Sequence, residues 1–250
     1  MAEQTFVIYK MEVKAAHGVA VEVPQKNWHH DLPAMAAAIT DKTRLLFVCN
    51  PNNPTGTMAT KAEVAALMER VPDHVVVVFD EAYYEYVRHP EFPESLGYVK
   101  AGRPVIVLRT FSKIYGLAGL RIGYGITTPE ITNYLNRIRP PFNANSMAQR
   151  AALAALDDDA HVAASRSLNH VEMDKVRDGL RRLGFEALPS ETNFLYFDVG
   201  RSGRAVFDAL LAKGIIVRHI EGRMLRVTIG LPEENQLFLS ALEDVTRASQ

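Results

Sequence analysis

The chain alternates short apolar runs with segments of helical periodicity. Three runs, at residues 45–49, 75–79 and 105–108, are apolar at every position. Such continuous apolar runs are typical of strands that are buried on both faces of a parallel sheet. Between the first two runs, Thr60 and Glu63 have the spacing of a capping box, which predicts a helix. Strand, helix and strand in this order predict an α/β fold.

The second half of the chain predicts a different unit. A helix capped by Ser146 is expected through Leu156, and a longer helix that ends at Gly184 is expected to connect two domains. The later elements are three strand-like segments, at 193–198, 215–217 and 225–229, and two helices, at 206–213 and from about 233. Strands around two helices favour a smaller α+β domain. The expected domains are residues 1–160 and residues 161–250.

Composition and charge exclude several classes of protein. The 250 residues carry 28 Lys plus Arg and 29 Asp plus Glu, so the net charge of −1 gives no reason to expect nucleic acid as a partner. The single Cys49 excludes an internal disulfide and a cysteine-rich zinc site. His29 and His30 lack a third ligand at a recognisable spacing, so no metal is expected. No apolar run approaches the ~18 residues of a membrane helix. The N-terminus lacks the basic segment followed by an apolar segment that is typical of a signal peptide. A cytoplasmic protein without a membrane partner is therefore expected.

Polar side chains follow the first two apolar runs. The prolines and glycine of NPNNPTG at 50–56 predict a rigid turn that holds Asn53 at the carboxyl end of a strand, where open α/β sheets bind ligands. Asp80 ends the second run, and a carboxylate there is costly unless it has a partner. Taken alone, the first stretch also fits a simple strand-to-helix turn and Asp80 also fits a turn cap.

The segment at 109–125, after the third run, contains Ser112, Lys113 and Arg121 among apolar residues and glycines. A desolvated lysine has a lowered pKa and can form a Schiff base. A hydroxyl and a guanidinium are common phosphate ligands. The glycine spacing matches neither the dinucleotide fingerprint nor the P-loop, so a nucleotide is not indicated. An amide, a carboxylate, an amine and phosphate ligands at three strand ends instead match the groups of pyridoxal phosphate.

Six segments also carry a family resemblance, in order along the chain: NPNNPTGT at 50–57, FDEAYYEY at 79–86, RTFSKIYGLAGLRIGYG at 109–125, RPPFNANSMAQRAAL at 139–153, PSETNFLYFDV at 189–199 and RVTIG at 226–230. With these segments the sequence resembles the fold-type I pyridoxal-phosphate aminotransferases, and among them the histidinol-phosphate aminotransferases. The resemblance implies a large domain with a mixed, mainly parallel sheet and helices on both faces, followed by a smaller C-terminal α+β domain.

The resemblance implies a role for each site residue. Lys113 would form the Schiff base with the cofactor and later move the substrate proton, and Asp80 would pair with the pyridinium nitrogen. Asn53 and Tyr83 would contact the ring oxygen, and Ser112 and Arg121 would bind the phosphate. Phe6 would stack on the face of the ring. Arg226 would bind the substrate carboxylate, and Arg218 is a second candidate for contact with the substrate.

The implied activity is amino-group transfer between histidinol phosphate and 2-oxoglutarate in histidine biosynthesis, with glutamate as the donor in the biosynthetic direction. A homodimer is implied as well. The alternatives are an aromatic amino-acid aminotransferase, a decarboxylase or lyase on the same scaffold, and a chain of the same fold that binds no cofactor.

The resemblance also implies that about 100 N-terminal residues of the family, the size of a small domain, are missing from this chain. They would carry part of the phosphate-binding site, so reduced or absent activity and exposed apolar patches are expected. The opening residues 1–6 align with a strand of the family, and Tyr9, Trp28 and Phe47 are expected in the core or at an interface.

Overall fold

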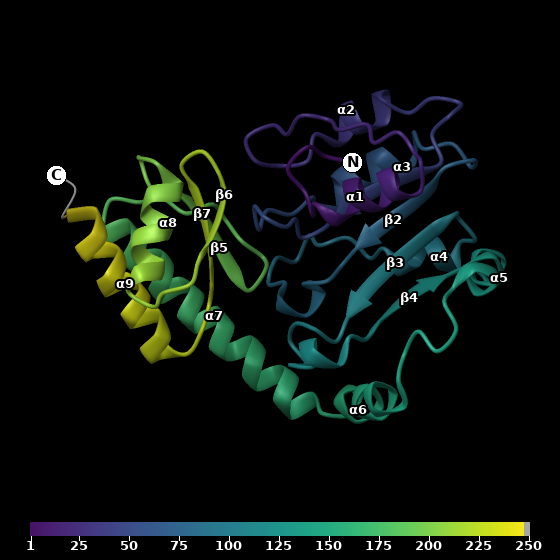
Figure 1. Ribbon diagram of the computed structural model, residues 1–250. Helices are drawn as coiled ribbons and strands as arrows, with labels where there is room; N and C mark the ends of the chain where they lie inside the picture. The colour runs from purple at the N-terminus through teal and green to yellow at the C-terminus, as the bar shows by residue number, and fades with distance from the viewer. Residues whose placement is uncertain (248–250) are drawn as a thin grey trace.

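The computed structural model describes residues 1–247 (Figure 1). The larger sheet has the order β1-β2-β3-β4, formed by Leu45–Cys49, Val76–Asp80, Val105–Thr110 and Gly123–Thr127. β1, β2 and β3 are parallel, so the three apolar runs are confirmed as neighbouring strands. β4 runs antiparallel to β3. The apolar pattern does not predict β4, because Gly123 and Gly125 interrupt it.

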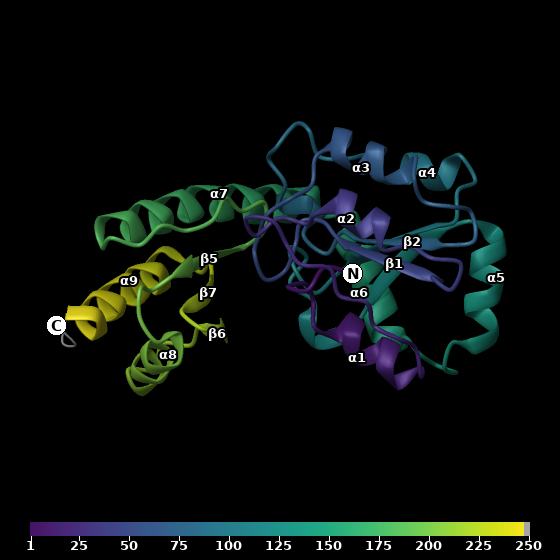
Figure 2. The ribbon, with the colours of Figure 1, turned by 90° about the horizontal axis from the view of Figure 1, so that it is seen from above.

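Helices cover both faces of this sheet, as expected. Figure 2 shows α2, α3 and α4 on one side and α1 and α6 on the other. Their bounds, with that of α5, are Ile8–Ala15 (α1), Leu32–Ala37 (α2), Lys61–Met68 (α3), Leu96–Lys100 (α4), Pro129–Ile138 (α5) and Ser146–Leu156 (α6). α3 begins with the predicted capping box, in which Thr60 and Glu63 each bond the other's backbone N–H.

The smaller sheet is antiparallel and has the order β5-β7-β6, formed by Phe194–Asp198, Met224–Thr228 and Arg218–Glu221. Side chains of α7 (Asp159–Arg182), α8 (Gly203–Ala212) and α9 (Pro232–Arg247) form its hydrophobic core. The 24-residue α7 runs from the larger unit to the smaller one (Figure 1), as the predicted connector does. The boundary between residues 160 and 161 stays a prediction.

Three local predictions are wrong. The cap of α6 is Asn145, whose side chain accepts the Ala148 N–H at 2.8 Å, and Ser146 is the first helical residue. Residues 215–217 form no strand, because the Ile215 N–H bonds to the Leu210 carbonyl and so closes α8. Residues 1–6 contribute only a single bridge, between Ala2 and Val23.

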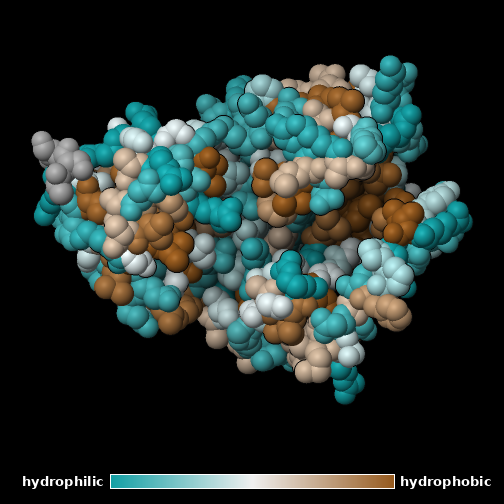
Figure 3. Space-filling view, viewed as in Figure 1, coloured by the Kyte–Doolittle hydropathy of each residue, from teal (hydrophilic) through white to brown (hydrophobic). Residues whose placement is uncertain are grey.

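Exposed apolar side chains gather on the larger unit, as expected. Figure 3 shows brown hydrophobic surface around a hollow on the side that carries α1 and α5. Phe142 is 98% exposed and Ile138 is 79% exposed, and Met11 on α1 is more than half exposed. Patches of this kind on a folded chain are typical of surfaces that another segment or subunit covers. Within residues 1–247, no helix is both long and apolar enough to cross a membrane.

Candidate active site

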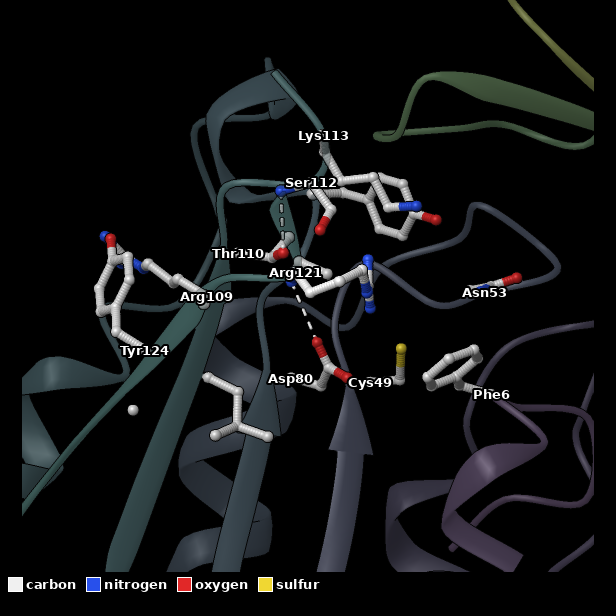
Figure 4. A pocket seen from close by; sticks show the side chains of 15 residues that line it. Phe6, Cys49, Asn53, Asp80, Arg109, Thr110, Ser112, Lys113, Arg121 and Tyr124 are labelled. Atoms are coloured by element: carbon white, nitrogen blue, oxygen red, sulfur yellow. Dashed lines mark hydrogen bonds between the residues drawn. The ribbon is translucent and has the colours of Figure 1, made fainter. Parts of the chain in front are cut away.

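The carboxyl ends of the three parallel strands open onto a cavity of about 550 Å³ (Figure 4). Open α/β sheets bind their ligands at this end of the strands. The lining includes every residue that the sequence assigned to the cofactor: Phe6, Asn53, Asp80, Tyr83, Ser112, Lys113 and Arg121. It also includes Cys49, Ala82, Leu108, Arg109, Thr110, Gly123, Tyr124 and Gly125. The individual roles of the predicted residues stay predictions.

The turn after β1 presents Asn53 because its neighbours are used internally. The Asn50 side chain bonds the Ala59 backbone in both directions, at 3.1 and 2.8 Å. The Asn52 amide donates to Thr55 Oγ1 at 2.9 Å and accepts from Thr5 Oγ1 at 2.9 Å. Both asparagines are buried. The two flanking amides thus fix the turn and leave the Asn53 amide at the cavity.

Gly56 closes this turn against the smaller unit. Its φ is +79°, and a Cβ added there would lie 2.4 Å from Ser190 Oγ, a hydroxyl that itself bonds the Phe194 carbonyl. We expect Gly56→Ala to lower the free energy of unfolding by about 2 kcal/mol, through both the dihedral and the collision. Gly102→Ala is the control, since Gly102 has a φ of +74° but open space around it. Equal losses in a chemical denaturation of the two variants would contradict the role of the Ser190 contact.

Asp80 ends β2 with both carboxylate oxygens occupied. Oδ1 accepts the Ala82 N–H at 3.1 Å and Oδ2 accepts the Tyr9 hydroxyl at 2.5 Å. Burial raises the pKa of Asp80, while these hydrogen bonds and the positive charge of Lys113 lower it. The sequence predicts Tyr9 in the core or at an interface, and the structure buries it within this chain, but nothing in the local pattern indicates that its hydroxyl reaches Asp80.

Lys113 lies in the loop that follows β3. Its Nζ is 5.3 Å from the centre of the Tyr83 ring and has no hydrogen-bond acceptor among residues 1–247. Burial lowers the pKa of Lys113, and the positive charge of Arg226 lowers it further, against the opposing effect of Asp80. A larger fraction of this amine is therefore neutral, and nucleophilic, at a given pH than for an exposed lysine.

Ser112 and Arg121 enter the cavity from the two ends of the same loop. The Ser112 N–H donates to Thr110 Oγ1 at 3.0 Å, which turns the chain at the end of β3. Arg121 has a left-handed φ of +56° and one guanidinium nitrogen donates to the Ala118 carbonyl at 2.8 Å. Figure 4 shows both side chains directed into the cavity that holds Asp80. A hydroxyl and a guanidinium fork are thus available to one anion.

Arg226 connects β7 of the smaller unit to the turn after β1. Its guanidinium donates to Asn53 Oδ1 at 2.5 Å and lies 4.6 Å from the centre of the Phe194 ring. Its Nε is buried and has no partner in the described part of the chain, and burial lowers the pKa of Arg226. Arg218 lies opposite Arg226 in β6 but is exposed, and neither arginine is among the residues that line the cavity. Arg226 differs from Arg218 because it is partly buried and bonds Asn53, which does line the cavity, so the geometry favours Arg226 as an anion ligand.

The sequence did not single out the pair that Glu81 and Arg109 form beside the site. Glu81 is 1% exposed, and its Oε2 accepts from Nε and a terminal nitrogen of Arg109 at 3.1 and 2.8 Å. The guanidinium carbon of Arg109 lies 3.5 Å from the centre of the Tyr84 ring. The pair could have been predicted from the order of the strands. Asp80 pairs with Leu108 in the parallel register of β2 and β3, so the next residues, Glu81 and Arg109, are neighbours of opposite charge.

Removal of Arg109 is expected to destabilise the fold. Arg109→Met leaves Glu81 as an unpaired buried carboxylate, at a cost of about 3 kcal/mol in the free energy of unfolding. Burial already raises the pKa of Glu81 and Arg109 opposes that effect, so the variant raises the pKa further. A carboxyl with a raised pKa in the folded state loses stability as the pH rises through that pKa. The loss should therefore be larger at neutral pH than in mildly acidic buffer.

Denaturation of two further variants checks this assignment. Arg204→Met removes a pair with Asp208 in which both side chains are exposed, so a change within about 0.5 kcal/mol is expected. Adding Glu81→Gln to Arg109→Met removes the buried charge and should recover part of the lost stability. Equal effects of Arg109→Met and Arg204→Met would refute the buried pair as a source of stability.

The donor set is chemically complementary to pyridoxal phosphate. An amine is available for the aldehyde at Lys113, and a carboxylate is available for the ring nitrogen at Asp80. The amide of Asn53 and the phenol of Tyr83 line the cavity and would suit a ring oxygen, and the hydroxyl of Ser112 and the guanidinium of Arg121 would suit a phosphate. Beside the cavity, Arg226 bonds Asn53 and keeps a buried Nε without a partner among residues 1–247. The residues therefore fit the group that the sequence predicted.

Comparison with known proteins shows the family. The model of the family "aminotransferase class I and II" matches residues 1–242. The histidinol-phosphate aminotransferase of Moorella thermoacetica is 51% identical over 98% of this chain and 65% of that protein. Histidinol-phosphate aminotransferase 2 of Pseudomonas fluorescens is 47% identical over 98% of this chain and 67% of that protein.

Solved structures agree as well. The histidinol-phosphate aminotransferase of Sinorhizobium meliloti, in complex with pyridoxal-5'-phosphate, superposes with a TM-score of 0.94 at 29% identity, over 100% of this chain and 70% of that one. The expected fold-type I class is thereby confirmed. The chain spans about two thirds of the curated relatives that it matches, 65% of one and 67% of another. With a family model over nearly its whole length and relatives of this similarity, the chain belongs to the class I and II aminotransferase family.

Proposed function

We propose that the protein is a pyridoxal-phosphate-dependent aminotransferase that exchanges an amino group between histidinol phosphate and 2-oxoglutarate. The observation that carries the proposal is the Lys113 amine, which has no acceptor among residues 1–247 and a lowered pKa in the cavity that also holds Asp80. The identity of 51% to a histidinol-phosphate aminotransferase supports the choice of substrate.

The residues of this chain have separable tasks in that reaction. When bound, the cofactor withdraws electrons from the substrate carbon that carries the amino group. Lys113 would hold the cofactor through its aldehyde and, when its amine is free, would move a proton at that carbon. Asp80 would accept a hydrogen bond from the ring nitrogen and favour its protonated form. Ser112 and Arg121 would hold the phosphate.

Arg226 is the proposed ligand of the substrate anion. Its planar fork suits a carboxylate, such as that of glutamate, and a phosphate, such as that of histidinol phosphate. Phe194 and Asn53 hold the fork in place from two sides. An arginine that accepts both anions explains how one site serves two substrates in alternation.

The first experiment mixes the purified chain with pyridoxal phosphate and records the visible absorption band of the lysine-linked cofactor. Glutamate is then added and the 2-oxoglutarate formed is measured. In the reverse direction, 2-oxoglutarate is supplied as the acceptor, and the glutamate formed is measured with histidinol phosphate, tyrosine or phenylalanine as alternative amino donors. Preference for histidinol phosphate supports the proposal, whereas preference for the aromatic amino acids supports an aromatic aminotransferase. Release of carbon dioxide without a keto acid would identify a decarboxylase. A folded chain without the band would show that these residues do not suffice to hold the cofactor.

The proposal includes a homodimer in the cytoplasm. The exposed apolar side chains on α1 and α5, such as Met11 and Ile138, support a further protein surface over this region. Sedimentation velocity at several concentrations tests the assembly, and a monomer at every concentration would contradict it.

A further inference from the structure

We propose that Tyr9 is a positioning residue for Asp80, and that its hydroxyl holds the carboxylate in the orientation and ionisation state that the ring nitrogen of the cofactor requires. The inference rests on the proposed function for the cofactor, but the interaction itself lies within this chain. Tyr9 does not line the cavity, so it acts through Asp80 and not by contact with cofactor or substrate.

The hydrogen bonds of Asp80 carry the argument. The Tyr9 hydroxyl donates to Oδ2 at 2.5 Å, and the Ala82 backbone N–H donates to Oδ1 at 3.1 Å. One donor, Tyr9, comes from α1 and is 71 positions from Asp80 along the chain, and the other, Ala82, lies just after β2. With one fixed donor on each oxygen, the plane of the carboxylate is determined. The remaining lone pairs are free to face the cavity.

The ring of Tyr9 is itself held in place. It stacks on Phe47 of β1, with ring centres 4.7 Å apart and planes 13° apart. It also meets the edge of Phe6, at 5.6 Å and 85°. Tyr9 is 6% exposed, so water has little access to its hydroxyl as a competing hydrogen-bond partner. Since Phe6 lines the cavity, Tyr9 links the side chain expected on the ring face to the one expected at the ring nitrogen.

The electrostatic surroundings make this hydrogen bond consequential. Burial raises the pKa of Asp80, and the Tyr9 hydrogen bond counteracts it by stabilising the ionised form. The other titratable groups that face Asp80 are Lys113, whose positive charge also lowers its pKa, and Cys49 and Tyr83. Burial raises the pKa of the Cys49 thiol to about 12, so this group stays neutral. Burial also raises the pKa of Tyr9 far above its usual value, so the phenol remains a donor throughout the working range.

Tyr9→Phe tests the inference, because it keeps the stacked ring and removes only the hydroxyl. The protein is first measured without cofactor, by nuclear magnetic resonance titration of carbon-13-labelled aspartate carboxyls, with Asp80→Asn to identify the Asp80 signal. We expect Tyr9→Phe to raise the pKa of Asp80 by about one unit. Tyr98→Phe is the matched control: Tyr98 stacks on Phe79 of the same sheet and is absent from the contacts of Asp80, so no shift is expected.

The second readout uses the protein with pyridoxal phosphate. Tyr9→Phe should lower kcat for the glutamate half-reaction by about tenfold with little change in KM, because the hydroxyl affects the ring nitrogen through Asp80 and does not contact the substrate anion. The pH profile of the cofactor absorption should move as well, whereas a merely structural loss would change the melting temperature and leave that profile in place.

The outcomes separate the two proposals. A folded Tyr9→Phe protein with an unchanged Asp80 titration would overturn the positioning role. If the parent chain takes up no cofactor, the proposed function fails for this chain, and the Asp80 titration alone decides the role of Tyr9. If Tyr9→Phe does not fold, a ring-fluorinated tyrosine at position 9 replaces it. This stronger donor should lower the pKa of Asp80, and an unchanged or raised pKa would overturn the inference.

Discussion

Lys113→Ala is expected to remove the visible absorption band of bound cofactor and to slow glutamate conversion by more than about 10³-fold, since in the proposed function this amine both links the cofactor and transfers the proton. Lys113 Nζ has no acceptor in the described chain, so its removal breaks no hydrogen bond on which the fold depends. The melting temperature without cofactor should therefore stay close to that of the parent. Absorbance and single-turnover kinetics with glutamate measure the two effects.

The control for this variant is Lys100→Ala, at an exposed position in the last turn of α4. It should leave both the band and the rate unchanged. The pH dependence gives a further check. Because burial and Arg226 lower the pKa of Lys113, its reaction with an aldehyde should reach half-maximal rate at a lower pH than that of an ordinary lysine. A visible band that persists in Lys113→Ala would show that another lysine holds the cofactor.

Arg226→Gln is expected to weaken glutamate binding by about 30- to 100-fold, the equivalent of one or two hydrogen bonds to a charged group. The side chain is held between Asn53 and Phe194, and its buried Nε has no partner among residues 1–247, so the guanidinium that we propose as the anion ligand is in place before a substrate arrives. Such preorganisation makes the guanidinium worth more than a flexible surface charge. Stopped-flow measurement of the glutamate half-reaction at increasing glutamate separates the binding constant from the maximal rate.

The same variant should raise the pKa of Lys113, because the positive charge of Arg226 is one of the causes that lower it. Arg223→Gln is the matched control, since Arg223 is exposed in the same region and pairs with Asp198 at the surface. It should change neither glutamate binding nor the Lys113 titration. An Arg226→Gln protein that binds glutamate as tightly as the parent would assign the carboxylate to a different cation, with Arg218 as the first to examine.

Much of the larger unit could be predicted from local patterns. The three apolar runs became β1, β2 and β3, and the Thr60 capping box starts α3 as predicted. These predictions succeed because burial on both faces and helix capping are decided by residues close together in sequence. Because the strands are parallel, their carboxyl ends meet at one edge, and the polar residues that follow them converge on one cavity.

The predictions from sequence fail where contacts with distant residues, or competition between neighbouring residues, determine the local structure. β4 contains two glycines and is a strand only because β3 supplies its hydrogen bonds. Residues 215–217 have a β-branched, apolar pattern, yet the Ile215 N–H is taken by the end of α8. Asn145 and Ser146 are both good caps, and only the backbone conformation selects the first.

Local patterns in the sequence are enough to predict the strands that carry the site, the chemical groups at their ends and the family. These follow from hydrophobic periodicity and from motifs whose residues are neighbours along the chain. The partners of those groups follow only from the folded arrangement: Tyr9 donates to Asp80, Arg109 to Glu81, and Arg226 to Asn53. Each of these contacts joins segments that are between 28 and 173 residues apart, and their meeting depends on how whole elements pack, which no local pattern contains.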